Sequence, residues 1–250
     1  MIGTARAALF DLDGTLLDTA PDMAAALNLL RAEQAQRPLP FALLRPQVSN
    51  GAVAMVRTAF PETEGDEFER LRERFLELYR TNLAVHTRLF AGFDSVLSRL
   101  EQCAIPWGIV TNKAAWLTEP LLEALGLRQR AGCVLSGDSL PERKPHPLQL
   151  LVAAEQLGLA PAQCVYVGDA LRDVQAANAA GMCALGAQFG YLNPADEPQH
   201  WPVAGWLATP QDLLPWLDLT HEHAGARRNS GWYWQVSPPA YWSACCASGS

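Results

Sequence analysis

Two aspartates, Asp11 and Asp13, stand one residue apart at the end of a short apolar run and just before a Gly-Thr pair. The run, residues 7–10, has the length and composition of a buried strand. Two carboxylates at such a strand end repel each other and lose solvation, and a bound cation removes both penalties. Oxygen ligands with room for water and phosphate suit Mg²⁺ better than Ca²⁺. An acidic turn is the alternative, because Asp-Gly is a common turn pair.

Other polar residues follow apolar segments later in the chain. Thr111 and Asn112 end one predicted strand, and Asp169 ends another, with Asp173 four residues further on. Lys144 lies just before a helical segment. Because binding sites in open parallel sheets form at the carboxyl ends of strands, we expect these groups to converge. Lys144 is then a candidate phosphate clamp, although a lysine is more often a surface cation.

The segments that position these residues alternate between strand and helix patterns from Leu89 onward. Such alternation implies a parallel sheet with helices on both faces, so we predict an α/β, Rossmann-like fold. Predicted strands cover residues 105–110, 133–135, 164–167 and 183–187, and predicted helices cover residues 94–102, 116–125, 147–157 and 173–180.

Residues 18–88 interrupt this alternation and carry only helical patterns. We predict helices at 24–35, in two pieces between 39 and 59, and at 67–83. Thr19 and Asp22 have the spacing of a capping box. Because this block lies between the first and second strands, we expect it to form a helical cap inserted into a catalytic core made of residues 1–17 and 89–219.

Residues 220–250 follow neither pattern, and they are rich in Gly, Ser, Pro and Trp and include the adjacent pair Cys245 and Cys246. We expect a mostly disordered or non-native tail, with an aromatic partner-binding motif as the alternative.

The composition argues against several classes of protein. The 250 residues are 49% hydrophobic, which allows a sizeable core. A net charge of −7 without a long basic run argues against nucleic-acid binding. No apolar stretch is long enough to span a bilayer and the first residues lack a signal-peptide pattern, so we expect a cytoplasmic protein without membrane association. The six cysteines form no CxxC pair, which argues against structural zinc. The oligomeric state remains open.

Four short motifs together resemble those of the haloacid dehalogenase-like hydrolases. The resemblance spans residues 6–219 and implies a Rossmann-like sheet with a helical cap inserted after the first motif. The motifs, in order, are Asp11-Leu12-Asp13-Gly14-Thr15, Thr111-Asn112, Lys144-Pro145, and Gly168-Asp169 with Asp173.

The resemblance also implies the role of each aspartate. Asp11 would attack phosphorus and form an aspartyl-phosphate, while Asp13 would act as general acid and base. Mg²⁺ would be held by the Asp11 side chain, the Asp13 main-chain carbonyl and Asp169. Asp173 would orient Lys144 or a metal-bound water.

Three further residues would hold the phosphoryl oxygens as charge shifts in the reaction. By the resemblance they are Thr111, the Asn112 backbone N–H and Lys144. The fourth motif departs from many relatives at Ala170, where they carry a small polar residue; this removes one possible hydrogen bond and leaves both aspartates present.

Asp13 distinguishes a phosphatase from other chemistries of the family. Dehalogenases lack this second aspartate, and phosphonatases use a cap lysine, of which residues 18–88 contain none. A sugar phosphomutase would need a phosphate-binding cap, which Arg45 and Arg57 could supply. A non-catalytic binding protein on the same fold is a further alternative, although Asp11, Asp13 and Asp169 are all present.

Two local resemblances bear on the substrate. Residues 10–22 look most like the phosphoglycolate phosphatase branch, and residues 189–196 with Trp201 are similar to the N-acetylmuramic acid 6-phosphate phosphatases of bacterial cell-wall recycling. We therefore expect a Mg²⁺-dependent phosphomonoesterase acting on a small phosphorylated metabolite, with N-acetylmuramic acid 6-phosphate preferred and phosphoglycolate as the alternative. Arg45, Asn50 and Gly51 of the cap are expected to approach the leaving group.

Overall fold

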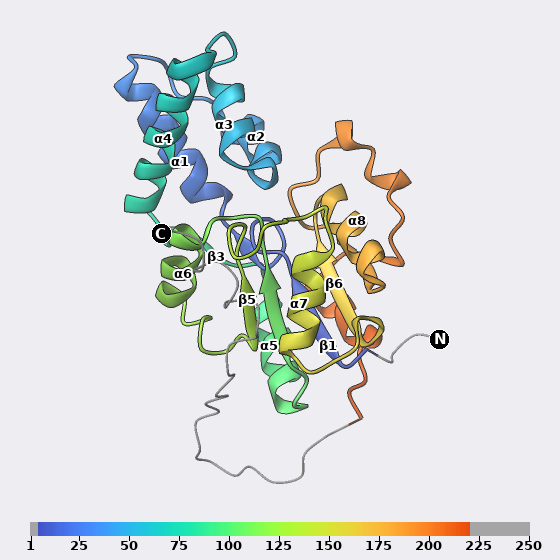
Figure 1. Cartoon of the computed structure of the whole chain (residues 1–250). Helices are drawn as coiled ribbons and strands as arrows, with labels where there is room; N and C mark the ends of the chain where they lie inside the picture. The colour runs from blue at the N-terminus through green and yellow to red at the C-terminus, as the bar shows by residue number, and fades with distance from the viewer. Residues whose placement is uncertain (1–4, 221–250) are drawn as a thin grey trace, which may run out of the picture.

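The computed structural model describes residues 5–220, which contain a six-stranded sheet in the order β5-β4-β1-β6-β7-β8 (Figure 1). All five pairings in this sheet are parallel. The strands are β1 (Ala7–Phe10), β4 (Trp107–Val110), β5 (Cys133–Leu135), β6 (Cys164–Gly168), β7 (Cys183–Ala187) and β8 (Gly205–Leu207). The predicted α/β fold with a parallel sheet is confirmed.

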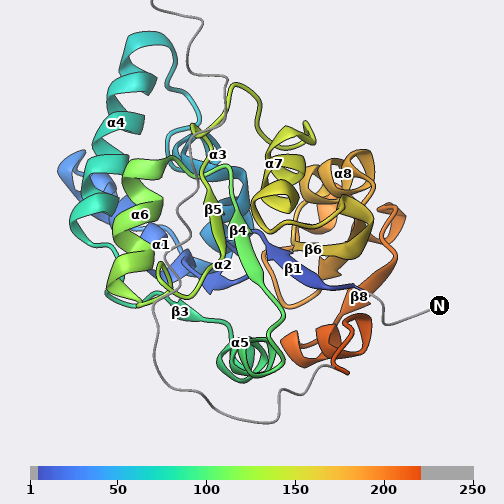
Figure 2. The same cartoon turned by 60° about the horizontal axis from the view of Figure 1, so that its bottom comes forward.

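Helices cover both faces of this sheet. Successive residues of its central strand β1 point to opposite faces and therefore pack against different helices. Phe10 belongs to a buried cluster with residues of α5 and α6, and Leu9 belongs to another with residues of α7 and α8. Figure 2 shows α5 on one side of β1 and β4, and α7 and α8 on the other. These helices are α5 (Phe93–Gln102), α6 (Ala115–Ala124), α7 (Leu148–Gln156) and α8 (Leu171–Ala180).

A separate group of helices, the helical block, stands over one end of the sheet (Figure 1). It has its own buried cluster, which includes Leu27, Val56 and Phe75. Tyr191, in the loop that follows the strand β7, also belongs to this cluster. Its elements are α1 (Ala20–Glu33), α2 (Phe41–Leu44), the 3₁₀ helix η1 (Arg45–Asn50), α3 (Gly51–Ala59) and α4 (Gly65–Thr81).

The chain enters and leaves the helical block through a two-stranded antiparallel ribbon. The ribbon consists of β2 (Leu17–Asp18) and β3 (Arg88–Leu89), in which Asp18 pairs with Arg88. The prediction that residues 18–88 contain no strand is therefore wrong at both ends. Two-residue strands are too short to give a periodic pattern, so the sequence did not reveal them.

The predicted capping box at the start of α1 is also wrong. The Thr19 hydroxyl donates to Asp13 Oδ1 at 2.6 Å and does not cap the helix. The Asp22 carboxylate accepts from the backbone N–H groups of His86 and Thr87 at 2.8 and 2.9 Å. Contacts with distant parts of the chain thus replace the local cap and fix the start of α1 to the ribbon.

The remaining differences from the predicted elements are small. The sequence did not predict β8, whose three residues begin with glycine.

Among the described residues, none of the helices has both the length and the apolar character needed to cross a bilayer. The tail predicted at 220–250 lies outside the described residues apart from Thr220. Short 3₁₀ helices complete the fold: η2 (Pro161–Gln163), η3 (Pro194–Asp196), η4 (Pro198–His200) and η5 (Pro210–Trp216).

Candidate active site

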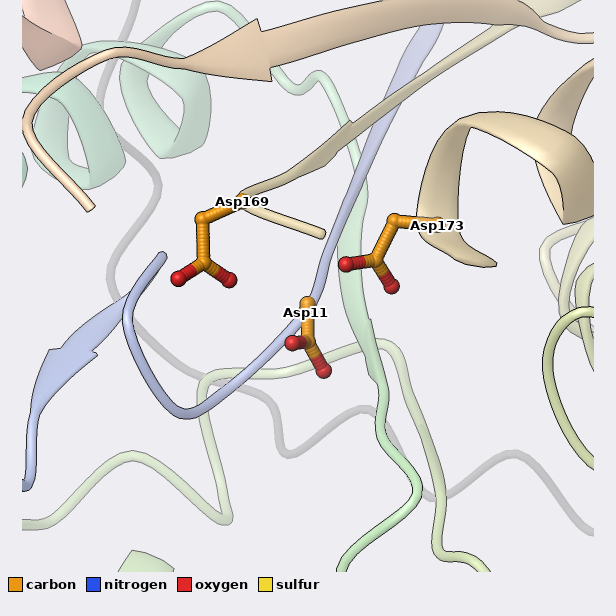
Figure 3. Close-up of side chains that lie close together, drawn as sticks. All are labelled: Asp11, Asp169 and Asp173. Carbon is orange, nitrogen blue, oxygen red and sulfur yellow. The ribbon is translucent and has the colours of Figure 1, made fainter. Parts of the chain in front are cut away.

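Three aspartates meet at the carboxyl ends of neighbouring strands. Asp11 directly follows β1, Asp169 directly follows β6, and Asp173 lies in the first turn of α8. All three are buried, and one carboxylate oxygen from each lies within 4.8 Å of the others. Figure 3 shows the carboxyl groups facing one another, with Asp11 between the other two. The parallel topology creates this cluster, because β1 and β6 are adjacent and end at the same edge.

Lys144 joins two of these aspartates. Its Nζ donates to Asp11 Oδ1 and to Asp173 Oδ1, both at 2.7 Å, and its side chain is 0% exposed. The Tyr166 hydroxyl at 2.7 Å and the Val110 carbonyl at 2.9 Å are also within hydrogen-bond distance of this ammonium, which shares its three N–H groups among the four acceptors. Asp173 Oδ2 accepts from the backbone N–H of Ala170 at 3.0 Å. Both carboxylate oxygens of Asp173 therefore accept hydrogen bonds from the protein.

The cluster holds more negative charge than Lys144 can offset. Burial, followed by the neighbouring Asp11 and Asp173 carboxylates, raises the pKa of Asp169 to about 7. Burial also raises the pKa of Asp11, although the Lys144 ammonium acts in the opposite direction. A divalent cation would relieve this repulsion, and a donor set made only of oxygen suits Mg²⁺. The residues at this edge thus fit a magnesium ion.

The Asp13 carboxylate lies apart from the three-aspartate cluster. The Lys113 ammonium donates to its Oδ1 and Oδ2 at 3.0 and 3.3 Å, and Thr19 donates to Oδ1. Lys113 also donates to the Tyr79 hydroxyl of α4 at 3.1 Å. Burial lowers the pKa of Lys113, but Asp13 and Tyr79 together raise it further, so the lysine stays charged. The orientation of Asp13 is therefore fixed from both the sheet edge and the helical block.

Thr111 and Asn112 form the turn that follows β4. The Thr111 hydroxyl accepts from the backbone N–H of Lys113 at 3.2 Å. The Asn112 side-chain amide donates to the Lys144 carbonyl at 2.8 Å and so ties this turn to the segment that carries the lysine. Both residues line the same pocket as Asp11, Asp13 and Lys144.

That pocket lies between the sheet edge and the helical block and has a volume of about 590 Å³. The block contributes Asn50 and Gly51, two of the residues predicted to approach a leaving group. Apolar side chains from both parts form much of the remaining wall, and Arg143 adds a cation. The larger apolar residues of the lining are Met23, Val48, Val53, Leu76, Trp116 and Leu117.

The structure does not bring Arg45 into this pocket. Its guanidinium donates to the carbonyls of Gly190 and Phe189 at 3.1 and 3.2 Å, so it links the helical block to the loop after β7. Arg57 stays within the block, where it lies 4.2 Å from the centre of the Phe68 ring. Neither arginine provides a second phosphate site of the kind that a phosphomutase would need.

Ser49 of η1 reaches the aspartate cluster from the helical block. Its hydroxyl donates to Asp169 Oδ2 at 2.6 Å, and Tyr191 donates its backbone N–H to the same oxygen at 2.9 Å. Gly14 packs against this carboxylate with a φ of +84°, and a Cβ there would collide with it. Asp169 is thus held by groups from three separate segments.

Sequence reasoning missed three residues of this site. Lys113 directly follows the Thr111-Asn112 pair, and Arg172, which also lines the pocket, directly precedes Asp173, so their positions within the motifs were the available signals. Ser49 had no comparable signal, since it is one small polar residue in a segment without a recognised motif.

Comparison with known proteins agrees with the geometry. Residues 8–187 match the model of the haloacid dehalogenase-like hydrolase family. The chain is 47% identical to the phosphoglycolate phosphatase of Xanthomonas campestris over 208 residues, which is 83% of this chain and 94% of the relative. It is 42% identical to the N-acetylmuramic acid 6-phosphate phosphatase of Pseudomonas putida over 214 residues, or 85% and 96% of the two chains.

A solved structure has the same fold over nearly its whole length. The crystal structure of a predicted phosphoglycolate phosphatase from Haemophilus somnus matches with a TM-score of 0.76 and 29% identity. The match covers 86% of this chain and 98% of that one. The resemblance seen in the four motifs is therefore confirmed: the chain belongs to the haloacid dehalogenase-like hydrolases, and it is a phosphatase.

Proposed function

We propose that this phosphatase hydrolyses phosphate monoesters through an aspartyl-phosphate on Asp11, with Mg²⁺ as its cofactor. The observation that carries the proposal is the buried carboxylate of Asp11, 2.7 Å from the Lys144 ammonium and beside Asp169 at the sheet edge. A carboxylate held between a cation and a metal site can approach an anionic phosphate without prohibitive repulsion.

The proposed reaction has two steps. An Asp11 oxygen attacks phosphorus, and the bond from phosphorus to the ester oxygen breaks while Asp13 gives that oxygen a proton. Water then attacks the phosphorus of the aspartyl-phosphate while Asp13 takes a proton from the water; the bond from phosphorus to the Asp11 oxygen breaks, which restores the Asp11 carboxylate and releases inorganic phosphate. Thr111, the Asn112 N–H and Lys144 hold the phosphoryl oxygens during both steps.

Asp11, Asp169 and the main-chain carbonyl of Asp13 would hold the magnesium ion. When bound, the ion supplies charge neutralisation for the phosphate. Asp173 serves as an orienting residue, because its carboxylate is engaged by Lys144, Tyr166 and the backbone N–H of Ala170.

For the substrate, we propose a phosphorylated sugar acid, with N-acetylmuramic acid 6-phosphate as the specific candidate. A pocket of about 590 Å³ lies in the range that encloses ligands much larger than a two-carbon acid. Trp116, which is 42% exposed, offers the pocket an aromatic surface on which a sugar ring can pack. The Pseudomonas putida relative, named for this substrate, is consistent with the proposal.

Phosphoglycolate is the second candidate. It is supported by the name of the Xanthomonas campestris relative, which is the more similar of the two enzymes at 47% identity. Both candidate substrates carry a carboxylate besides the phosphate. Arg143 is the pocket residue suited to bind it, because Arg143 is exposed and no carboxylate of the described residues forms an ion pair with it.

A substrate panel tests this proposal. We expect phosphate release that depends on Mg²⁺ and stops with EDTA, and a higher kcat/KM for N-acetylmuramic acid 6-phosphate than for phosphoglycolate. N-acetylglucosamine 6-phosphate is the matched control, because it has the same sugar without the lactyl carboxylate. Activity that persists in EDTA contradicts the metal assignment, and equal kcat/KM values for all three esters contradict the sugar-acid assignment.

The same matched pair of sugars tests Arg143. Replacing Arg143 by Gln should lower the preference for N-acetylmuramic acid 6-phosphate over N-acetylglucosamine 6-phosphate by about tenfold, the value of one charge-assisted hydrogen bond. Arg130→Gln is the control, because Arg130 pairs with Glu101 away from the pocket. An unchanged ratio in Arg143→Gln would show that another group reads the carboxylate.

A further inference from the structure

The helical block contributes one hydroxyl group to the proposed metal site. Ser49 Oγ lies 2.6 Å from Asp169 Oδ2 and 3.5 Å from the main-chain oxygen of Asp13. Asp169 and the Asp13 carbonyl are two of the three groups proposed to hold the magnesium ion. The hydroxyl therefore reaches the metal ligands from the opposite side of the pocket.

The segment that carries Ser49 is attached to the sheet edge beside Asp169. Arg172, which lies between the motif aspartates, donates to the Ser49 carbonyl and, at 3.3 Å, to Asn50 Oδ1. Arg45 lies 4.7 Å from the centre of the Tyr191 ring, and the Tyr191 N–H donates to Asp169 Oδ2. The contacts of η1 with the sheet edge thus converge on the environment of a single carboxylate.

We propose that Ser49 is a positioning residue of the metal site, and that it couples cation binding to the seating of η1 on the sheet edge. The proposal rests on the magnesium site of the proposed function. Together with the Tyr191 N–H, which donates to the same oxygen, the Ser49 hydroxyl fixes the rotation of the Asp169 carboxylate and directs its remaining lone pairs toward the ion. Removal of such an orienting hydrogen bond lowers metal affinity by about 10- to 100-fold in known metal sites.

This coupling is reciprocal. If the contact between Ser49 and Asp169 favours cation binding, the bound cation must favour the seated position of η1 by the same factor. The cation would then order residues 45–51, of which Val48, Ser49, Asn50 and Gly51 line the pocket. Metal loading would in this way prepare the substrate side of the pocket before any ester arrives.

Two replacements of Ser49 that are nearly isosteric with each other separate the effect of the hydroxyl from that of side-chain volume. Ser49→Thr keeps the donor, and Ser49→Val has a methyl group where threonine has its hydroxyl. Binding of Mn²⁺, measured by the loss of the free-ion EPR signal, should weaken about 10- to 100-fold in Ser49→Val and less than about threefold in Ser49→Thr. Gln47→Ala is the control, because Gln47 lies on the same turn but does not line the pocket. Equal affinities for the Thr and Val variants would overturn the proposal.

Hydrogen exchange tests the coupling with the wild-type protein as well. Mg²⁺ should slow backbone exchange at residues 45–51 in the wild type and in Ser49→Thr, and much less in Ser49→Val. Protection of this segment that is absent in the wild type, or equal in all three proteins, would refute the coupling. Failure of the wild type to release phosphate from any ester would contradict the proposed function alone, because both measurements here follow the cation without turnover.

Discussion

The sheet edge and the helical block build opposite walls of the same pocket with different kinds of contact. At the sheet edge, Asp11, Asp173 and Lys144 are buried and joined side chain to side chain at 2.7 Å. In the helical block, Arg45 donates to main-chain carbonyls of the loop after β7, and it is half-buried. The edge therefore has a fixed charge arrangement suited to chemistry, whereas Arg45 attaches the block to uncharged main-chain acceptors.

This difference predicts that changes at the sheet edge mainly alter the rate, whereas changes in the block away from Ser49 mainly alter substrate binding. The largest expected effect is that of Asp11→Asn. An amide cannot act as the nucleophile, so turnover of p-nitrophenyl phosphate with saturating Mg²⁺ should fall by at least about 10⁴-fold. The far-UV circular dichroism spectrum should be unchanged.

The matched control is Asp94→Asn, which removes a carboxylate that is 84% exposed on α5. This variant should keep normal turnover. A rate within tenfold of the wild type for Asp11→Asn would mean that another residue is the nucleophile, and the contrast between edge and block would lose its basis.

A smaller effect concerns stability without metal. Folding raises the pKa of Asp169 to about 7. The Asp169 carboxyl therefore keeps its proton in the folded state up to about pH 7, whereas in the unfolded chain it loses the proton near pH 4. Ionisation of Asp169 therefore costs stability as the pH rises from about 4 to about 7. In EDTA, Asp169→Asn should be stabilised relative to the wild type more at pH 8 than at pH 5, by on the order of 2 kcal/mol.

Urea unfolding at the two pH values measures this difference, and Mg²⁺ should reverse the order of stability at pH 8 by binding only the wild type tightly. If the difference in unfolding free energy between the variant and the wild type is the same at both pH values in EDTA, the carboxylates at the edge do not repel one another as proposed.

The smallest expected effect is that of Arg45→Ala in the helical block. The loss of two hydrogen bonds to carbonyls loosens the block, so KM for the preferred ester should rise about three- to tenfold with little change in kcat. Arg70→Ala is the matched control, because Arg70 is exposed on the same block and does not line the active-site pocket. A fall in kcat as large as that of Asp11→Asn would show that the block takes part in chemistry.

Sequence patterns predicted the sheet edge well, for a physical reason. Asp11, Thr111 and Asp169 each follow a buried strand, and parallel topology brings the ends of such strands together. Their places at the ends of predicted strands therefore indicated that they lie close together in space. The roles assigned to them stay predictions until the variants are measured.

The helical block shows where that reasoning stops. The contact between Ser49 and Asp169 joins residues 120 positions apart and depends on how the helices settle over the sheet. Thr19 illustrates the same limit. Its local sequence predicted a helix cap, but its hydroxyl donates a hydrogen bond to the Asp13 carboxylate instead. Local patterns report strand ends and helix faces, but they do not report which surface residue meets which across a pocket.

The ribbon of β2 and β3 has a consequence for how this architecture can be altered. Because Asp18 pairs with Arg88, the two chain crossings lie side by side, and the span between them begins and ends at nearly one point. Its length can change with little added cost of loop closure. A chimera that exchanges everything between these two paired positions should therefore keep the register of the sheet, which makes the ribbon a natural splice point for engineering new selectivity.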